Sequence, residues 1–380
     1  METKIIQIAY KDPECRDGSS PLSLTQESEA ALYEAAEILR RGGLVAFPTE
    51  TVYGLGANAL DEEAAKKIYE AKGRPSDNPL IAHIADFAAL KPLVAQVPDC
   101  ARKLMDAFWP GPLTIIFKKS AIVPYGTTGG LETVAVRMPN HPAAMELIRL
   151  AGIPVAAPSA NTSGRPSPTT AEHVAQDMRG RIDMIVDGGE VGIGVESTIV
   201  DVSEGVPTVL RPGAVTMEML KEVLGDVRID QAVLEPMKAD VKPKAPGMKY
   251  RHYAPKASLT LVEGTVEEMT EAIAILTDRE VRQGRKVGII CTEETKSLYP
   301  QGILRSIGTR SEAASIAHNL YGVLREFDDL DVDVIFSEAF SSDKLGQAVM
   351  NRLTKAAGYH IVKAEEVGKT HRNHTETTAK

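Results

Sequence analysis

The sequence predicts an α/β protein of two domains, and three observations support this. Its 380 residues are more than a single domain usually contains, since about 150 residues per domain is common. Short apolar runs alternate with segments of helical spacing, which is the pattern of sheets covered by helices. A Lys- and Pro-rich stretch interrupts this alternation and marks a boundary. We expect a larger domain at 20–225, a linker at 226–256, a smaller α/β domain at 257–363 and a disordered tail at 364–380.

Composition narrows the class of protein. Hydrophobic residues make up 43% of the chain, yet no run approaches the roughly 18 apolar residues of a membrane span. The net charge of −9 disfavours direct, stable nucleic-acid binding but permits a local basic pocket. Cys15, Cys100 and Cys291 are far apart, which fits a reducing cytosol and argues against a structural zinc. Residues 1–10 carry no secretion pattern. We therefore expect a cytoplasmic protein.

The stretch Leu44–Asn58 organises the first domain. Its apolar start predicts a buried strand, which Pro48 ends. Residues 49–51 then leave the sheet at the carboxyl end of the strand, where α/β sheets bind ligands. Gly54 and Gly56 allow a tight turn or close approach to a ligand. A glycine-rich turn with ordinary capping hydroxyls explains the same stretch equally well.

The remaining helices and strands of the first domain are predicted from the spacing of apolar residues and from the residues that begin and end each segment. The segment Thr25–Arg41 has acids first, bases last and two glycines after it, which predicts a helix. Further helical segments are expected at Asp61–Ala71, Phe87–Val94, Cys100–Ala107 and His141–Leu150. Strands are expected at Leu80–Ile84, Leu113–Phe117, Val134–Val136, Val155–Ala157, Met184–Val186 and Ser197–Asp201, with a flexible loop at Thr127–Gly130.

Charged and polar side chains gather at the strand ends of this domain. Two prolines exclude a helix from the loop after Lys72, so Lys72 and Arg74 stand close to a strand start. The loop 158–170 is dense in hydroxyls and glycine, as in an exposed loop or an anion site. The full set is Thr51, Lys72, Arg74, His83, Arg137, Ser159, Asn161, Ser197 and Arg211. It predicts a site that positions anions without a nucleophile. The bases could equally be solvated surface residues, and His83 a core histidine.

The linker ends in an unusual run, Pro246–Pro255. It contains three rings and two bases between prolines, which a simple spacer does not need. We expect it to close over the first domain as a lid, with Tyr250 and His252 as lid residues; an anchored linker is the alternative. Beyond it, strands alternate with helices at Val266–Gln283, Ser311–Phe327 and Asp343–Ala357, which predicts a small parallel sheet. No Walker A, GxGxxG, GxSxG or HExxH motif occurs.

Three motifs resemble the threonylcarbamoyl-AMP synthase family. They are Phe47-Pro-Thr-Glu-Thr-Val-Tyr-Gly-Leu55, Lys72-Gly-Arg74 followed by Ser-Asp-Asn-Pro-Leu, and Pro158-Ser-Ala-Asn161. The Lys-x-Arg and Ser-x-Asn pairs are signatures of that family. The resemblance covers roughly Leu24–Val215, and the later Gly-Met-Lys-Tyr-Arg-His-Tyr-Ala-Pro run resembles the family's long form. It implies a YrdC-like twisted mixed sheet with surrounding helices, and a smaller C-terminal Rossmann-like parallel α/β domain.

The resemblance also implies an activity and residue roles. The family makes L-threonylcarbamoyl-AMP from L-threonine, bicarbonate or CO2, and ATP, releasing pyrophosphate, with Mg2+ entering on the ATP. Downstream transferase proteins then use the product to modify tRNA next to the anticodon. Implied threonine-binding positions are Thr51, His83, Arg137, the Ala157 backbone and Ser197. Implied ATP-binding positions are Lys72, Arg74, Asn78, Thr133, Ser159, Asn161, Ser167 and Arg211. No side-chain nucleophile and no protein metal ligand is implied.

Two other functions remain open from the residues alone. The same sheet could hold RNA or a nucleotide without turnover, although the acidic balance of the chain disfavours RNA. A carbamoyl-adenylate-forming carbamoyltransferase is the second alternative. Such proteins normally carry acylphosphatase or zinc-finger modules, and three scattered cysteines do not supply the latter. Pyrophosphate release with and without threonine and bicarbonate separates all three.

Overall fold

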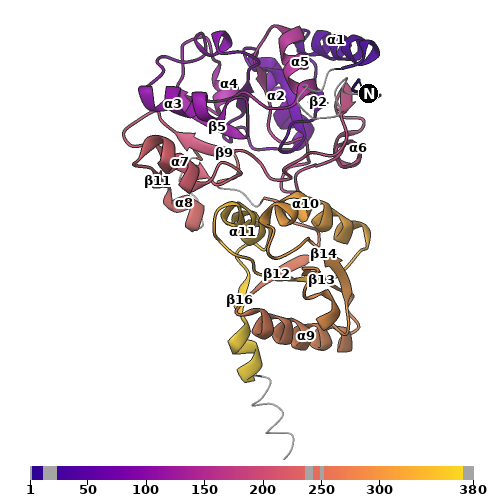
Figure 1. Ribbon diagram of the computed structural model, residues 1–380. Helices are drawn as coiled ribbons and strands as arrows, with labels where there is room; N and C mark the ends of the chain where they lie inside the picture. Colours follow the sequence, from indigo (N-terminus) through magenta and orange to yellow (C-terminus); the bar gives the residue numbers. More distant parts are fainter. Residues whose placement is uncertain (1, 12–23, 236–242, 249–251, 371–380) are drawn as a thin grey trace, which may run out of the picture. The chain divides into compact units, whose positions relative to one another are not determined.

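The computed structural model describes residues 2–11, 24–235, 243–248 and 252–370. The chain divides into two compact units (Figure 1). The first unit is Met1–Ser163 with Ser167–Tyr250, and the second is Gly164–Pro166 with Arg251–Lys380. Within the described residues, no helix combines the length and apolar character that a membrane crossing needs.

The first unit is built on one mixed sheet of eleven strands. Their order across the sheet is β1-β8-β2-β3-β7-β4-β6-β5-β9-β10-β11. Both parallel and antiparallel pairs occur, because β4 runs parallel to β6 while β5 runs antiparallel to it. The predicted mixed sheet is thus confirmed. The strands are β1 (Lys4–Gln7), β2 (Val45–Phe47), β3 (Gly54–Asn58), β4 (Ile81–His83), β5 (Leu113–Lys118), β6 (Thr133–Arg137), β7 (Val155–Ala156), β8 (Met184–Asp187), β9 (Thr198–Asp201), β10 (Thr208–Arg211) and β11 (Arg228–Ile229).

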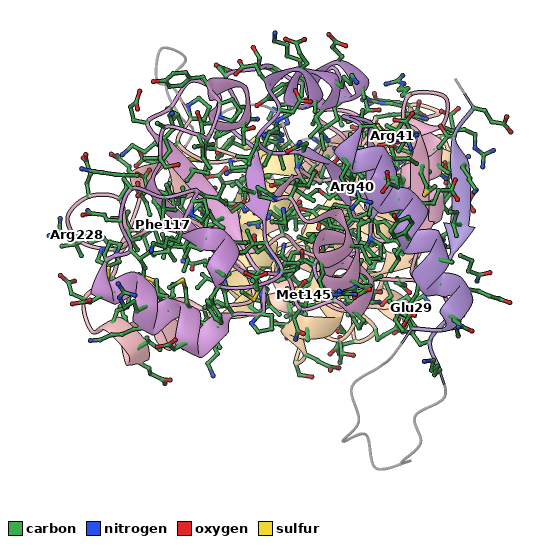
Figure 2. All side chains as sticks on the ribbon, turned by 90° about the horizontal axis from the view of Figure 1, so that it is seen from above. Glu29, Arg40, Arg41, Phe117, Met145 and Arg228 are labelled. Atoms are coloured by element: carbon green, nitrogen blue, oxygen red, sulfur yellow. The ribbon has the colours of Figure 1, made fainter. Side chains whose placement is uncertain are left out.

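Helices surround this sheet, and their ends follow capping rules. Thr25 caps the first helix by accepting from the Ser28 backbone NH, and Figure 2 shows Glu29 toward one end of that helix and Arg40 toward the other. Gly73 ends the second helix at φ 62°, a left-handed conformation that suits glycine. The helices are α1 (Gln26–Arg40), α2 (Glu62–Lys72), η1 (Ala88–Leu90), α3 (Asp99–Phe108), α4 (Tyr125–Thr128), α5 (Pro142–Ala151), α6 (Ala171–Met178), α7 (Met217–Leu224) and α8 (Gln231–Leu234).

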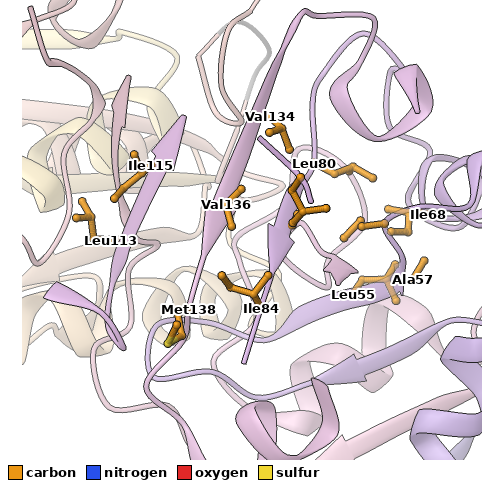
Figure 3. Packing of buried hydrophobic residues seen from close by; sticks show 14 of the residues in the cluster. Leu55, Ala57, Ile68, Leu80, Ile84, Leu113, Ile115, Val134, Val136 and Met138 are labelled. Atoms are coloured by element: carbon orange, nitrogen blue, oxygen red, sulfur yellow. The ribbon is translucent and has the colours of Figure 1, made fainter. Parts of the chain in front are cut away.

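The central strands separate a core face from a second face. Successive side chains of a strand point to opposite sides of the sheet. Val134 and Val136 of β6 join the main hydrophobic core with Ile115 of β5, as Figure 3 shows. Thr133, Ala135 and Arg137 alternate with them and therefore face the other way. Ala135 packs there in a smaller cluster with Ile81, Ile116, Ile199, Leu210, Ala245 and Met248.

The second unit contains a five-stranded sheet in the order β14-β13-β15-β12-β16. All four strand pairs are parallel, which confirms the predicted parallel sheet. Helix α9 covers one face, and α10 and α11 cover the other (Figure 1). The elements are β12 (Ser258–Glu263), α9 (Val266–Arg282), β13 (Val287–Cys291), η2 (Lys296–Leu298), β14 (Ile303–Ser306), α10 (Ala313–Asp329), β15 (Val334–Glu338), α11 (Leu345–Ala356) and β16 (Ile361–Lys363).

The structure differs from the sequence-based expectations at several places. Gly54 and Gly56, expected in a tight turn, belong to strand β3, which pairs with β2. The expected flexible loop Thr127–Gly130 begins inside α4 and ends in two glycines with positive φ. Only a 3₁₀ turn, η1, forms within the expected helical segment 87–94. The expected linker contains β11 and α8, because Val227 and Val233 find apolar burial. Residues 364–370, expected as disordered tail, are helical with Ala364 and Val367 buried, while 371–380 lie outside the described residues.

Candidate active site

Arg137 is the centre of the candidate site. It ends β6 and lies opposite His83 of β4 and Thr114 of β5. Its guanidinium is buried and donates through Nη1 to Thr51 Oγ1 at 3.0 Å and through Nε to the Gly111 carbonyl at 3.3 Å. A buried cation at a strand end, with its fork facing hydroxyl and carbonyl oxygens, is suited to hold a carboxylate.

The hydroxyl of Thr51 is oriented by its neighbour Thr49. Thr49 Oγ1 donates to the Val52 carbonyl at 2.7 Å, so the Thr51 hydroxyl must donate to Thr49 in their 2.9 Å contact. Thr51 Oγ1 therefore presents its lone pairs to Arg137. The backbone of this turn is fixed as well, because Ile193 NH donates to the Glu50 carbonyl and Gly194 NH to the Thr51 carbonyl. The hydroxyl-rich turn is thus a rigid part of the site.

Glu50 forms an ion pair with Arg137. Its Oε1 lies 2.7 Å from Arg137 Nη2, and the two side chains are 13% and 5% exposed. The contact lacks hydrogen-bond alignment, and neither oxygen of Glu50 has another hydrogen-bond partner within the described part of the chain. The sequence predicted that Glu50 lies just after the end of a strand, but it indicated no role for this residue. The structure makes it the counter-ion of the central arginine.

His83 is fully buried and neutral. Burial is the main cause that lowers its pKa to about 3, and the nearby charge of Arg137 lowers it further. Its Nδ1 lies 3.0 Å from the Ile81 carbonyl, and its ring meets Phe47 edge-on at 6.1 Å between centroids. Ala157 lies on the adjacent segment, where its NH donates to the same Ile81 carbonyl. A neutral imidazole adds no second positive charge beside Arg137.

Ser197 contacts Arg211 and the strand position opposite Arg137. Its Oγ lies 2.8 Å from Thr114 Oγ1, and Thr114 lies opposite Arg137 on the neighbouring strand. Arg211 donates to both the hydroxyl and the carbonyl of Ser197, at 3.2 and 3.0 Å. The five expected threonine-binding positions are therefore linked by contacts and strand register. Thr114 was missed by sequence reasoning, although a threonine in the apolar run Leu113–Phe117 was the available signal.

Lys72 holds the Ser-Ala-Asn loop in place. It is 1% exposed, and its Nζ donates to the backbone carbonyls of Ser159 and Asn161. Ser159 in turn donates through Oγ to Asn161 Oδ1, and it forms a bridge with Gly54. Lys72 is therefore not the solvated surface base that sequence reasoning kept as an alternative. It positions the loop from inside the domain.

Arg74 and Asn78 lie together just before β4, and Thr133 begins the neighbouring parallel strand β6. Arg74 is 9% exposed and donates to the carbonyls of Asn78 and Pro79. Asn78 Oδ1 is buried and has no hydrogen-bond partner among the described residues, so it is able to accept a hydrogen bond from a ligand. Thr133 begins the same strand that Arg137 ends, and both face one side of the sheet. The sheet face between Thr133 and Arg137 therefore connects the expected ATP-binding residues with the expected threonine-binding residues.

Ser167 and the run before residue 249 complete the predicted set. Ser167 is buried and donates to Glu196, a carboxylate that sequence reasoning missed. Ala245 and Met248 pack on Ile81 and Ala135, between Thr133 and Arg137, and Arg211 donates to the Pro246 carbonyl at 3.4 Å. Of the two lid residues, Tyr250 lies outside the described residues. His252 is buried in the second unit, 5.5 Å from the Tyr253 ring.

Fold and site together define an α/β protein of two compact units, the first of which gathers buried arginines and hydroxyl groups at one face of its sheet. Residues 37–213 match the family model described as "Telomere recombination". Residues 215–358 match the model described as "Threonylcarbamoyl-AMP synthase, C-terminal domain". Both compact units thus contain matched residues.

Similar proteins agree with these matches. The threonylcarbamoyl-AMP synthase of Bacillus subtilis is 50% identical over 339 residues, which are 88% of this chain and 95% of that protein. The one of Pyrococcus abyssi is 52% identical over 329 residues, 87% and 94% of the two chains. A solved structure, P. abyssi Sua5 complexed with L-threonine, is 48% identical with a TM-score of 0.86 and covers 95% of this chain and 99% of its own. The chain therefore belongs to the threonylcarbamoyl-AMP synthase family of enzymes.

Proposed function

We propose that this protein joins L-threonine, bicarbonate or CO2, and ATP into L-threonylcarbamoyl-AMP and releases pyrophosphate. The observation that carries the proposal is the buried Arg137 among Thr51, Thr114 and Ser197. A guanidinium beside several hydroxyls offers a fork for a carboxylate and partners for a substrate hydroxyl. A small hydroxylated amino acid meets both requirements. The L-threonine in the complex of the P. abyssi relative supports the same choice.

We assign threonine to Thr51, His83, Arg137, the Ala157 backbone and Ser197, as the family resemblance implies. Arg137 would hold the carboxylate, and the hydroxyl groups would receive the side-chain hydroxyl. His83 is neutral over the physiological pH range, because its pKa is lowered to about 3 by burial and Arg137. It can therefore accept or donate one hydrogen bond without competing for the carboxylate as a cation.

We assign ATP to the face that runs from Arg74, Asn78 and Thr133 toward Arg211. The unsatisfied Asn78 amide oxygen and the buried Arg74 supply polar contacts at one end. Ser159, Asn161 and Ser167 would contact the phosphates from the loop that Lys72 holds. Arg211 would offset phosphate charge near the threonine end, where it already borders Ser197.

The chemistry needs positioning and no nucleophile from the protein. The deprotonated threonine amine adds to CO2 and forms a carbamate with release of a proton. A carbamate oxygen then attacks the α-phosphorus of ATP, and pyrophosphate leaves with the bond electrons. Orientation of the two reactants and stabilisation of the developing charge by buried arginines would supply the rate enhancement.

Magnesium is proposed to enter with ATP. Among the described residues there is no group of three or more His, Cys, Asp or Glu side chains that could hold a metal ion. The donors present therefore do not fit a metal cage made by the protein, whereas magnesium commonly binds mainly through substrate phosphates and water. The protein's own contribution is the arrangement of arginine and hydroxyl groups around the triphosphate.

The run 246–255 is proposed to act as a lid over this face. The start of the run supports the idea, because Met248 and the preceding Ala245 lie on the same side of the sheet as Thr133 and Arg137. A cover at that position would exclude water from a reactive adenylate. We further propose that the product supplies transferase proteins that modify tRNA beside the anticodon, in the cytoplasm.

Pyrophosphate release tests the proposed reaction. Release from ATP should require both L-threonine and bicarbonate, and mass spectrometry should find threonylcarbamoyl-AMP. Release that depends on carbamoyl phosphate in place of threonine would indicate a carbamoyltransferase. Binding of ATP or RNA without any release would indicate a binding module.

A further inference from the structure

We propose that Glu50 is an exchangeable counter-ion in the amino-acid site. Its carboxylate neutralises Arg137 while the site is empty. When the carboxylate of the substrate takes that place on Arg137, Glu50 pairs with the substrate's ammonium group. The inference rests on the proposed role of Arg137 as the carboxylate ligand, and it adds a binding residue to that reaction.

The way in which Glu50 is held supports an exchangeable contact. Its side chain has one ion pair, to Arg137 Nη2, and no hydrogen bond in the described part of the chain. Its backbone is fixed, since Ile193 NH donates to its carbonyl at 2.9 Å. The carboxylate can therefore turn about its side-chain bonds without moving the chain.

Glu338 in the second unit shows what a permanently buried carboxylate looks like in this protein. It is 0% exposed and receives hydrogen bonds from Thr295, Tyr299 and Arg310. Buried carboxylates normally need several such donors, because losing hydration is unfavourable for a charged group. Among the described residues Glu50 has no comparable set of donors, and its one ion pair is with Arg137.

The balance of charges favours movement of Glu50 from Arg137 to the substrate's ammonium group. The empty pair of Glu50 and Arg137 is neutral, and threonine enters as a zwitterion that is also neutral. If Glu50 stayed on Arg137, an incoming carboxylate would meet a like charge in a buried site. If Glu50 were absent, the ammonium would approach Arg137 without an anion. Exchange gives two opposite-charge pairs in place of one.

The other titratable groups near Glu50 cannot take its place. His83 faces Arg137 from β4 and is neutral, with its pKa lowered to about 3 mainly by burial. His141, which precedes α5, has its pKa lowered to about 4 by burial, against an opposing effect of Glu50. Neither imidazole supplies a negative charge for an ammonium group. Glu50 is the carboxylate in direct contact with the central arginine.

Two half-substrates separate the exchange from a merely structural pair. L-threoninol has the ammonium but no carboxylate, and the matching dihydroxybutanoate has the carboxylate with a hydroxyl in place of the ammonium. Calorimetry would measure both probes on the full-length wild-type protein and on Glu50→Gln. Glu172→Gln, on the exposed first turn of α6, is a matched control. ATP binding and circular dichroism monitor folding.

We expect opposite effects on the two probes. Glu50→Gln should weaken L-threoninol by about tenfold or more, the loss expected for a hydrogen bond to a charged group. It should strengthen dihydroxybutanoate severalfold, because no carboxylate competes for Arg137. The wild type and Glu172→Gln should bind L-threoninol more tightly than dihydroxybutanoate, and Glu50→Gln should reverse that order.

Several results would overturn the inference. Weakening of both probes by Glu50→Gln would mean that Glu50 only orients Arg137. A wild type that already prefers dihydroxybutanoate would show that no carboxylate competes. Should Glu50→Gln not fold, Glu50→Ala must give the same reversal. Absence of threonine-dependent pyrophosphate release by the wild type would refute the proposed reaction, whatever the order of the probes.

Discussion

His83 and Arg137 lie directly opposite each other on the parallel strands β4 and β6, a neutral imidazole beside a buried guanidinium. The arrangement makes protonation of His83 unfavourable, because the new charge would be both buried and next to a cation. The same two residues therefore affect both the pH dependence of the stability of the first unit and the charge of its candidate site.

We predict acid destabilisation from this pair. The pKa of His83 is about 3 in the folded protein and about 6.5 when unfolded, so the unfolded state binds the proton first. The unfolding free energy should therefore fall as pH drops below about 6.5, by up to about 1.4 kcal/mol per pH unit, until pH reaches about 3. Urea unfolding followed by fluorescence of Trp109, the single tryptophan, reports on this unit.

The control for the pH effect is His83→Gln, which removes the titrating group. Its unfolding free energy should depend less steeply on pH between 6.5 and 5.5 than that of the wild type. His141→Gln should remove a similar share above its folded pKa of about 4. Curves for wild type and His83→Gln that run parallel over this range would contradict the prediction.

Arg137→Lys should weaken threonine binding and leave ATP binding nearly unchanged. A lysine has one nitrogen and cannot reach Thr51, Gly111 and a ligand carboxylate in the geometry of the guanidinium fork. The expected loss is about 1.5–3 kcal/mol, typical of a hydrogen bond to a charged group. Calorimetry with each ligand separately measures it, and a loss confined to ATP would refute the assigned role.

Lys72→Ala and Arg74→Ala should differ in their effect on stability. Sequence reasoning expects either change to weaken ATP binding by about 1.5–3 kcal/mol without harm to the fold. The structure alters that expectation for Lys72, because its removal leaves the part-buried carbonyl of Ser159 and the buried carbonyl of Asn161 without this donor. We expect Lys72→Ala to lose roughly 1–3 kcal/mol of unfolding free energy as well as ATP affinity.

Urea unfolding and ATP calorimetry on the same preparations test this difference. Lys72→Met keeps most of the buried chain volume, so it separates the lost hydrogen bonds from a cavity. Equal stability of Lys72→Ala and wild type would mean that the lysine does not hold the loop. Unchanged ATP affinity in a folded Arg74→Ala protein would remove Arg74 from the nucleotide site.

Valine should be a poor substrate. It matches threonine in shape but lacks the hydroxyl that Thr51 and Ser197 are expected to engage. A site built around hydrogen bonds rejects such an analogue by more than the roughly 10–200-fold that one methyl group can provide. The ratio of kcat/KM for pyrophosphate release with the two amino acids measures it. Equal release with valine would exclude a hydroxyl-reading pocket.

Deleting the chain after Val215 should abolish most synthesis even if the remaining part of the first unit still folds. The deletion removes Ala245 and Met248 from the face between Thr133 and Arg137. In the intact protein, protease cleavage near residue 249 should slow when ATP and threonine are both present. Full activity of a folded truncated protein, with cleavage that ignores the ligands, would leave the run as a linker.

Much of the fold was accessible from the sequence because the signals were local. Capping residues predicted α1 and α2 within one or two residues, and Pro48 correctly ended β2. The edge strands β14 and β16 were missed, since their short runs are only partly buried and lack a strong apolar pattern. The burial of 364–370 was missed because two apolar residues among charges do not predict a packing partner.

The site was predictable as a set of residues but not as a set of contacts. Motifs placed Thr51 and Arg137 in one site, yet nothing local indicated that Glu50 pairs with Arg137 across 87 positions of sequence. Thr114 and Glu196 were missed for the same reason. The position of Thr114 depends on the strand register that sets it opposite Arg137, and that of Glu196 on the loop that brings Ser167 to it. Neither property can be read from a local stretch of sequence.

Strand β6 alternates between the two faces of the sheet, and this limits how the sequence can change over evolutionary time. Val134 and Val136 fill the core, while Thr133 and Arg137 face the site from the same five residues. A substitution that relaxes the core must shift the backbone that aims Arg137. Substitutions at Val134 and Val136 are therefore limited both by the need to fold and by the need to keep Arg137 in position for the reaction. Where such a substitution occurs, we expect a compensating substitution on the neighbouring strands β4 or β5.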